Sequence, residues 1–160
     1  MPIKIPKEKA WAPLTWFLFH TLAENINVSY FEEEKLKLFN FVKKICNCLP
    51  CPYCAKDATQ IINNFNFEII KNKEDFKLFL FNFHNIINKK LKKKQYEINI
   101  LESYKKLNLI KCINDWTIYF KTYEKNYRDF ITPRIRANCV KLLCNYINSN
   151  LHKFNLQIFN

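Results

Sequence analysis

The stretch EDFKLFLFNFHNIINKKLKK, residues 74–93, carries the clearest helical pattern of this chain. Its apolar side chains recur every three or four positions, which is the spacing of one face of an α-helix. The members of this repeat are Phe76, Leu80, Phe83 and Ile87. An adjoining stripe of the same helix carries His84, Asn88 and Leu91. The segment therefore predicts a helix with one apolar face and one face that bears polar, ligand-binding side chains.

Similar periodicity extends in both directions from this helix. We expect helices at residues 13–27, 51–64, 97–107 and 113–127. Another helix should run from a capping box at Ser29 to about Lys44. The last helix should run from Pro133, capped by Thr132, to about Asn150. No segment reads as a strand. The sequence predicts an all-α fold, in which residues 8–107 form a four-helix bundle with an added short helix and residues 108–160 form a C-terminal helical extension.

The composition excludes several classes of protein. The chain has 160 residues and no glycine, so it lacks the glycine-dependent turns of P-loops and GxGxxG nucleotide sites. The net charge of +12 is spread along the chain, which is typical of a solvated basic surface, and no nucleic-acid partner is expected. We find no apolar run long enough for a transmembrane helix. Residues 1–7 lack the apolar core of a secretory signal.

The run CNCLPCPYC, residues 46–54, is the strongest chemical signal in the sequence. Pro52 suits the first turn of a helix that Cys51 opens. Residues three apart on a helix have Cα atoms about 5 Å apart, within the range that a disulfide spans. The free N–H groups of a helix N-terminus also stabilise a thiolate, which is the species that exchanges disulfides. Cys51 and Cys54 are therefore candidates for a reversible, redox-active pair.

A metal site is the alternative interpretation of this run. Four thiolates from Cys46, Cys48, Cys51 and Cys54 could bind zinc or an iron–sulfur cluster. In that case the protein would be a basic helical binding module. The aromatic helices on either side of the run favour the redox interpretation.

Three motifs in one order extend the signal beyond the cysteines. TWFLFH starts at Thr15, CPYC follows at Cys51, and HNIINKKLKK starts at His84. Together they resemble the Erv/ALR family of FAD-linked sulfhydryl oxidases, and the absence of a cysteine in residues 94–103 is similar to compact viral members. A third hypothesis is an inactive structural relative whose C-terminal helices serve as a docking surface.

The resemblance implies roles for individual residues. Cys51 and Cys54 would be catalytic, with Cys51 attacked by the substrate thiolate and Cys54 nearer the flavin. The side chains expected to bind FAD are Thr15, Trp16, His20, His84, Asn85, Asn88, Leu91, Lys93 and Tyr96. Cys46 and Cys48 are candidates for a shuttle pair that passes electrons from the substrate to CPYC.

The resemblance also implies the reaction and the partners. A dithiol and O₂ would give a disulfide and H₂O₂, with protein dithiols or a thioredoxin-like relay as substrates. Family members commonly form dimers through their first two helices, so we expect a homodimer. A viral member would act in the host cytoplasm or the virion, and the mitochondrial intermembrane space is the alternative compartment.

Three cysteines follow the family-like region. If residues 133–150 form one unbroken helix, Cys139 and Cys144 have Cα atoms about 9 Å apart, which is too far for a disulfide. They could then bridge only to other partners such as Cys112. The simpler expectation is that all three are small buried apolar side chains.

Overall fold

The computed structural model describes residues 10–122 and 133–156. Its helices are α1 (Trp11–Asn25), α2 (Val28–Asn47), α3 (Pro52–Asn63), α4 (Lys73–Lys90), α5 (Leu101–Tyr104), α6 (Leu109–Thr122) and α7 (Pro133–Ser149), with short 3₁₀ turns at Phe67–Ile69, Ile98–Ile100 and Leu151–Lys153. Extended pairing within the described ranges is limited to an isolated bridge between Ile26 and Phe154. The predicted all-α fold is confirmed.

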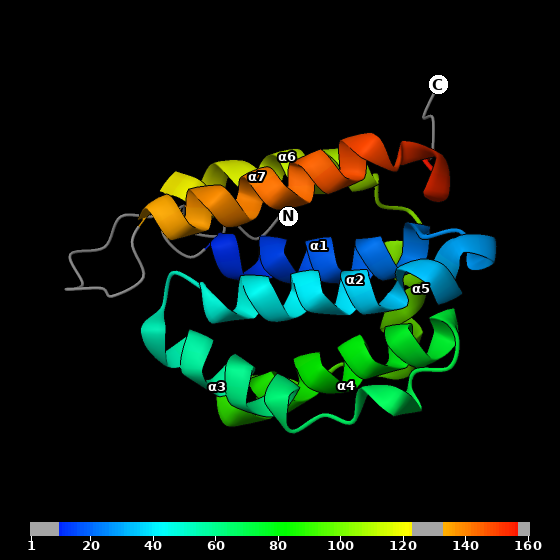
Figure 1. The fold of residues 1–160 in the computed structure, drawn as a ribbon. Helices are drawn as coiled ribbons and strands as arrows, with labels where there is room; N and C mark the ends of the chain where they lie inside the picture. Colours follow the sequence, from blue (N-terminus) through cyan, green and yellow to red (C-terminus); the bar gives the residue numbers. More distant parts are fainter. Residues whose placement is uncertain (1–9, 123–132, 157–160) are drawn as a thin grey trace.

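The helices form three layers of two (Figure 1). Helices α1 and α2 make the middle layer, α3 and α4 cover one side of it, and α6 and α7 cover the other side. The short helix α5 packs against one end of α1. Each helix of the middle layer therefore has neighbours on both sides, and most side chains of α1 are buried.

The capping box lies at a different helix from the one that the sequence predicted. The capping box expected at Ser29 is wrong, because α2 begins at Val28 and Asn27 accepts a hydrogen bond from the Ser29 N–H at 3.0 Å. The reciprocal capping box lies instead at α4, where Asn72 and Asp75 each accept from the other's backbone N–H. Asparagine is as good a helix cap as serine, so either residue could have set the start of α2. The expected cap at Thr132 and the helix end at 123–127 lie outside the described residues.

One hydrophobic core runs through the family-like region and the C-terminal helices. Trp116 and Phe120 of α6 and Leu143 of α7 are fully buried and belong to the same cluster as Leu18 and Phe19 of α1. The sequence boundary at residue 108 is therefore not a break in the core, and the C-terminal helices cover the α1–α2 layer.

A buried polar network also joins α7 to α2. Glu34 is 3% exposed and accepts hydrogen bonds from the Tyr146 hydroxyl at 2.6 Å and from the Lys153 ammonium group. Beyond α7, the N–H of Asn27 donates to the carbonyl of Lys153 at 2.8 Å. The C-terminal segment is thus fixed to the start of α2 by its side chains and by its backbone.

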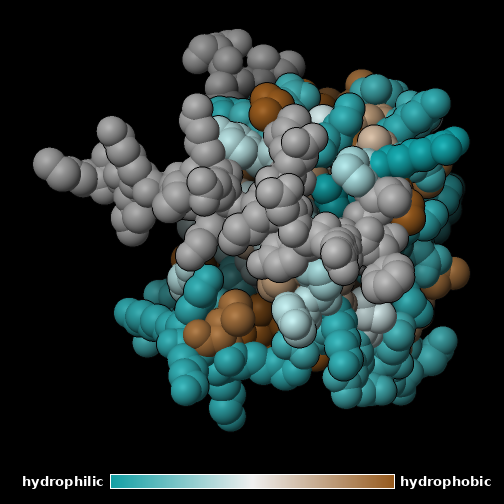
Figure 2. Space-filling view, turned by 90° about the vertical axis from the view of Figure 1, so that its left-hand side faces the viewer, coloured by the Kyte–Doolittle hydropathy of each residue, from teal (hydrophilic) through white to brown (hydrophobic). Residues whose placement is uncertain are grey.

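The end of the molecule that carries the start of α3 is mostly hydrophilic where its residues are described (Figure 2). A compact hydrophobic group interrupts this polar surface. Within residues 10–122 and 133–156, no helix has the length and apolar character needed to span a membrane.

Candidate active site

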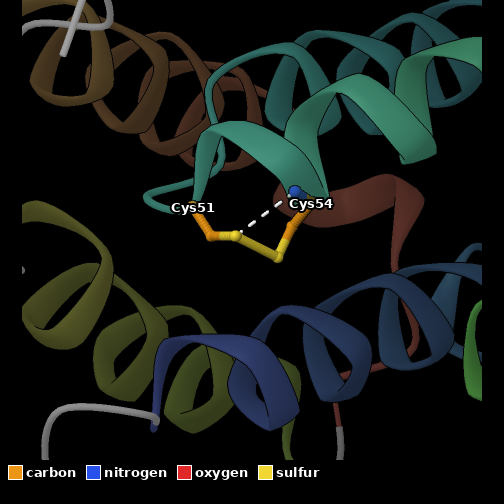
Figure 3. The surroundings of a disulfide bond; sticks show 2 residues. All are labelled: Cys51 and Cys54. Atoms are coloured by element: carbon orange, nitrogen blue, oxygen red, sulfur yellow. Dashed lines mark hydrogen bonds between the residues drawn. A yellow bond between two sulfur atoms is a disulfide. The ribbon is translucent and has the colours of Figure 1, made fainter. Parts of the chain in front are cut away.

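Cys51 and Cys54 form a disulfide at the first turn of α3 (Figure 3). Their Cα atoms are 5.2 Å apart, close to the separation expected for helical residues three positions apart. Cys51 is the N-cap of α3 and Pro52 is its first residue. The sequence-predicted redox pair is therefore assembled by local helix geometry alone.

The backbone of this turn favours negative charge on Cys51. Its sulfur accepts a hydrogen bond from the Cys54 N–H at 3.3 Å, drawn as the dashed line in Figure 3. Once the disulfide is reduced, the same N–H and the helix dipole would stabilise a Cys51 thiolate. Both cysteines are partly exposed, and Tyr53 between them is 80% exposed. A thiol from solvent can therefore reach the pair.

The four-cysteine metal site has no support in this arrangement. Cys51 and Cys54 are bonded to each other, whereas Cys46 and Cys48 are buried at the end of α2. In the described part of the chain, no group of three or more His, Cys, Asp and Glu side chains is placed to hold a metal ion. The described residues therefore do not support the zinc-binding alternative.

Four rings from three separate elements form an aromatic cluster. Trp16 of α1 stacks on His84 of α4 with ring centroids 4.0 Å apart and an interplanar angle of 8°. His20 stacks on Tyr104 of α5 at 4.3 Å. The Nε2 atom of His20 and the Nδ1 atom of His84 lie 3.1 Å apart. The structure thus brings three predicted cofactor-binding residues together and adds Tyr104, which no sequence motif singled out.

Both histidines of this cluster are uncharged at neutral pH. Burial and the neighbouring His84 lower the pKa of His20 from 6.5 to about 3. Burial and the positive charge of Lys93 lower the pKa of His84 to about 4. A neutral imidazole has one donor and one acceptor nitrogen, so the two rings can share a single hydrogen bond. The cluster therefore presents flat, neutral rings.

Asn88 provides the clearest sign that a ligand belongs here. Its side chain is 6% exposed, yet its Nδ2 atom has no hydrogen-bond partner among the described residues. A buried donor without a partner costs about 1–3 kcal/mol, which a bound acceptor would recover. Asn88 lies one turn of α4 beyond His84, and the influence of Lys93 on the His84 pKa places a positive charge close by. Flat rings, a free amide donor and a lysine fit an aromatic ligand that carries phosphates, such as FAD.

Asn85 acts on the chain that follows α4. Its amide donates to the Tyr96 carbonyl at 2.9 Å and accepts from the Tyr96 N–H at 2.8 Å. Lys92, with φ of 55°, lets the backbone turn back after α4. This turn brings the Tyr96 ring to 5.2 Å from His84. Asn85 therefore positions Tyr96 at the cluster, and a direct contact of Asn85 with a cofactor stays a prediction.

Two other predicted contacts lie away from the aromatic cluster. The Thr15 hydroxyl donates to the Trp11 carbonyl at 2.7 Å and accepts from the Trp116 indole N–H at 3.1 Å. Thr15 thus joins α1 to α6 in this structure. Leu91 is 51% exposed at the end of α4. Cofactor contacts for Thr15 and Leu91 stay predictions.

The remaining cysteines are reduced. Helix α7 runs unbroken through Cys139 and Cys144, which are both free thiols, so the two do not bridge. Cys112 and Cys139 are buried, and Cys144 is partly exposed. Cys48 lies close to Cys139 of α7, and each thiol shifts the pKa of the other. The Cys46/Cys48 shuttle stays a prediction.

Comparison with known proteins agrees with this geometry. The family model described as the Erv1 / Alr family matches residues 13–108. The mitochondrial FAD-linked sulfhydryl oxidase ERV1 of Saccharomyces cerevisiae is 27% identical over 88 residues, which are 55% of this chain and 46% of the yeast protein. A FAD-linked sulfhydryl oxidase of African swine fever virus is 31% identical over 84 residues, 52% of this chain and 70% of the viral protein.

The matched region contains the three motifs and every side chain of the CPYC turn and the aromatic cluster. This chain spans less than half of the yeast relative, so the comparison bears on this region rather than on the whole of that protein. The family model covers more than half of this chain. The chain belongs to the Erv1/Alr family.

Proposed function

We propose that this protein is a FAD-dependent thiol oxidase that makes disulfide bonds in protein substrates and uses O₂ as the final electron acceptor, releasing H₂O₂. The observation that carries the proposal is the Cys51–Cys54 disulfide at the start of α3, in a chain of this family. The partnerless Asn88 amide beside the stacked Trp16 and His84 rings supports the cofactor.

The substrate half of the reaction follows from the chemistry of the CPYC turn. A substrate thiolate attacks the sulfur of Cys51, which forms a mixed disulfide and releases Cys54 as a thiolate. A second substrate thiolate then attacks the substrate sulfur of that bond and releases Cys51. The substrate leaves as a disulfide and CPYC becomes a dithiol. The Cys54 N–H stabilises the departing Cys51 thiolate.

Six side chains would hold the cofactor in this proposal, namely Trp16, His20, His84, Asn88, Lys93 and Tyr96. The neutral rings would bind a flat heteroaromatic group, the Asn88 amide would donate a hydrogen bond, and Lys93 would neutralise phosphate charge. FAD, when bound, supplies a two-electron acceptor that oxygen can reoxidise.

Assembly and compartment belong to the same proposal. A homodimer through α1 and α2 would have to use surfaces that α6 and α7 leave uncovered, such as those around Phe17 and Leu36, which are 39% and 54% exposed. The named relatives include viral and mitochondrial proteins. We propose the host cytoplasm or virion for a viral protein, with the mitochondrial intermembrane space as the alternative.

The test begins with a spectrum of the purified full-length protein. We expect flavin absorbance, and O₂ consumption on addition of dithiothreitol. The Cys51→Ser/Cys54→Ser protein should keep the flavin and lose O₂ consumption. A colourless protein that also fails to bind added FAD would overturn the proposal.

A further inference from the structure

The end of α2 and the first half of α7 place two buried thiols against each other. Cys48 is the C-cap of α2 and is 4% exposed, and Cys139 of α7 is 3% exposed. Each thiol shifts the pKa of the other, so the two groups lie close together. About 90 residues separate them in the sequence, so their contact is a product of tertiary packing alone.

The same two side chains line a cavity between α2 and α7. Its volume is about 310 Å³, and its walls include Lys44, Asn47 and Asn138, all of which are exposed. Exposed side chains in the walls mean that the cavity opens toward solvent. A small reagent can therefore reach both sulfurs, although each cysteine is almost fully buried.

The surroundings of the pair favour exchange chemistry. The neighbouring Cys48 thiol and the positive charge of Lys44 lower the pKa of Cys139, although burial opposes them. The neighbouring Cys139 and burial raise the pKa of Cys48. The Cys48 thiol donates a hydrogen bond to the Lys44 carbonyl at 3.3 Å. One sulfur is thus prepared as a nucleophile and the other holds a proton.

We propose that Cys48 and Cys139 are a second redox-active pair, which closes as a disulfide and fastens α7 to the end of α2, three residues before Cys51. The oxidant is a disulfide that reaches the cavity. Nothing in this proposal depends on flavin binding or on oxidase activity.

The reaction proceeds in two exchanges. The Cys139 thiolate attacks one sulfur of the oxidant and forms a mixed disulfide, and one thiolate leaves. Cys48 loses its proton and attacks the Cys139 sulfur, so the Cys48–Cys139 bond forms and the second thiolate leaves. Two protein thiols are oxidised, one disulfide is reduced to two thiols, and these take up the two protons.

Closure would stabilise the fold around the active site. A bond that closes a loop of about 90 residues lowers the conformational entropy of the unfolded chain far more than that of the folded protein. Glu34 of α2 already bonds to Tyr146 near the end of α7, and Ile26, which precedes α2, pairs with Phe154 beyond α7. The new bond would therefore fix the opposite end of α7. We expect the Tm to rise on oxidation by roughly 5–15 °C.

Peptide mapping tests the pairing directly. Trypsin releases residues 137–141 with Cys139 as their only cysteine, whereas residues 45–56 contain Cys46, Cys48, Cys51 and Cys54. The full-length Cys51→Ser/Cys54→Ser protein leaves only two candidates in the second peptide. After treatment with oxidised glutathione and alkylation of free thiols, we expect the two peptides to be joined through Cys48 and released by reduction.

Single substitutions in the same background separate the alternatives. Cys139→Ser and Cys48→Ser should each abolish the joined peptide and the Tm rise. Cys144→Ser, on the same helix, and Cys46→Ser, on the same peptide, should retain both. Wild-type protein should give the joined peptides as well, so the result does not depend on any variant folding.

Two results would overturn the proposal. One is complete alkylation of Cys139 after oxidation of the wild-type protein. The other is a joined peptide that survives Cys48→Ser and disappears with Cys46→Ser, which would assign the bond to Cys46. Flavin binding and O₂ consumption play no part in either readout, so a failure here is distinct from a failure of the oxidase assignment.

Discussion

The indole N–H of Trp116 donates a hydrogen bond to the Thr15 hydroxyl across 3.1 Å, in a region that water does not reach. Thr15 in turn donates to the Trp11 carbonyl one turn earlier. The bond connects α6, which lies entirely beyond the residues matched by the family model, to the first helix of that match. The C-terminal helices are therefore part of the core on which the active site rests.

Replacing Trp116 tests this dependence. Trp116→Ala should lower the free energy of unfolding by about 3–5 kcal/mol, because it empties a fully buried site. Trp116→Phe should cost less, since it keeps most of the apolar volume and loses one hydrogen bond. Urea denaturation measures both. Ile118→Ala, at a position 58% exposed on the same helix, is the control and should stay within about 0.5 kcal/mol of wild type. An equal effect of the two alanine variants would contradict the packing role.

Removing the Tyr146 hydroxyl should weaken the attachment of α7. Tyr146→Phe leaves the buried Glu34 carboxylate with fewer donors, so we expect a loss of about 1–3 kcal/mol in the free energy of unfolding. A double-mutant cycle with Glu34→Gln should give a coupling energy of at least about 0.5 kcal/mol. Tyr119→Phe, on the partly buried Tyr119 of α6, is the matched control. Strict additivity would show that the two groups do not act together.

Cys54→Ser should reduce dithiothreitol-dependent O₂ consumption to the rate of the Cys51→Ser/Cys54→Ser protein. The substitution removes one sulfur of the only disulfide among the described residues and leaves the aromatic cluster intact. The measurements are O₂ uptake and flavin content of the same preparation. Cys112→Ser should keep its activity, because Cys112 contacts Thr21 rather than the CPYC turn. Wild-type turnover by Cys54→Ser would refute the catalytic role.

Asn88→Ala should weaken FAD binding about 10-fold, which corresponds to the loss of roughly 1.4 kcal/mol from one hydrogen bond. Fluorescence titration of flavin-free protein measures the Kd. Loss of the amide should not destabilise the flavin-free variant, because the Nδ2 atom has no partner without a ligand and its removal relieves the cost of a buried, unpaired donor. Asn82→Ala, at an exposed position of the same helix, should bind FAD as wild type does. An unchanged affinity of Asn88→Ala for FAD would show that the Asn88 amide does not bind the cofactor.

The neutral histidine pair should make the fold sensitive to acid. His20 and His84 have pKa values of about 3 and 4 in the folded protein, against 6.5 for an ordinary histidine. At pH values between the folded-state pKa values and 6.5, the unfolded chain binds more protons than the folded protein does. The free energy of unfolding therefore falls as the pH drops below 6.5. Each histidine contributes up to about 1.4 kcal/mol per pH unit. Above pH 6.5 the pair adds no pH dependence.

Urea denaturation of flavin-free protein at a series of pH values between 4 and 8 measures this slope. His20→Gln should remove about half of it. His152→Gln, at an exposed position, should leave it unchanged. A slope that is the same in His20→Gln and wild type would mean that His20 is not held neutral by burial.

The sequence by itself determined the helices and the redox pair, because both depend on short-range geometry. Apolar residues at helical spacing specified α4 to within a few residues, and α3 begins as Cys51 and Pro52 predicted. The Cys51–Cys54 separation follows from the rise and turn of a single helix. The start of α2 was missed because Asn27 and Ser29 are both good caps, and local preference does not choose between them.

Only the tertiary structure decided which side chains meet across helices. The Tyr104 ring stacks on His20, the Trp116 indole donates a hydrogen bond to the Thr15 hydroxyl, and Cys48 and Cys139 line the same cavity. Each of these contacts joins residues about 80 to 100 positions apart. Periodicity shows which face of a helix is buried, but it carries no information on which other helix covers that face. That choice is made when all the apolar faces pack into one core.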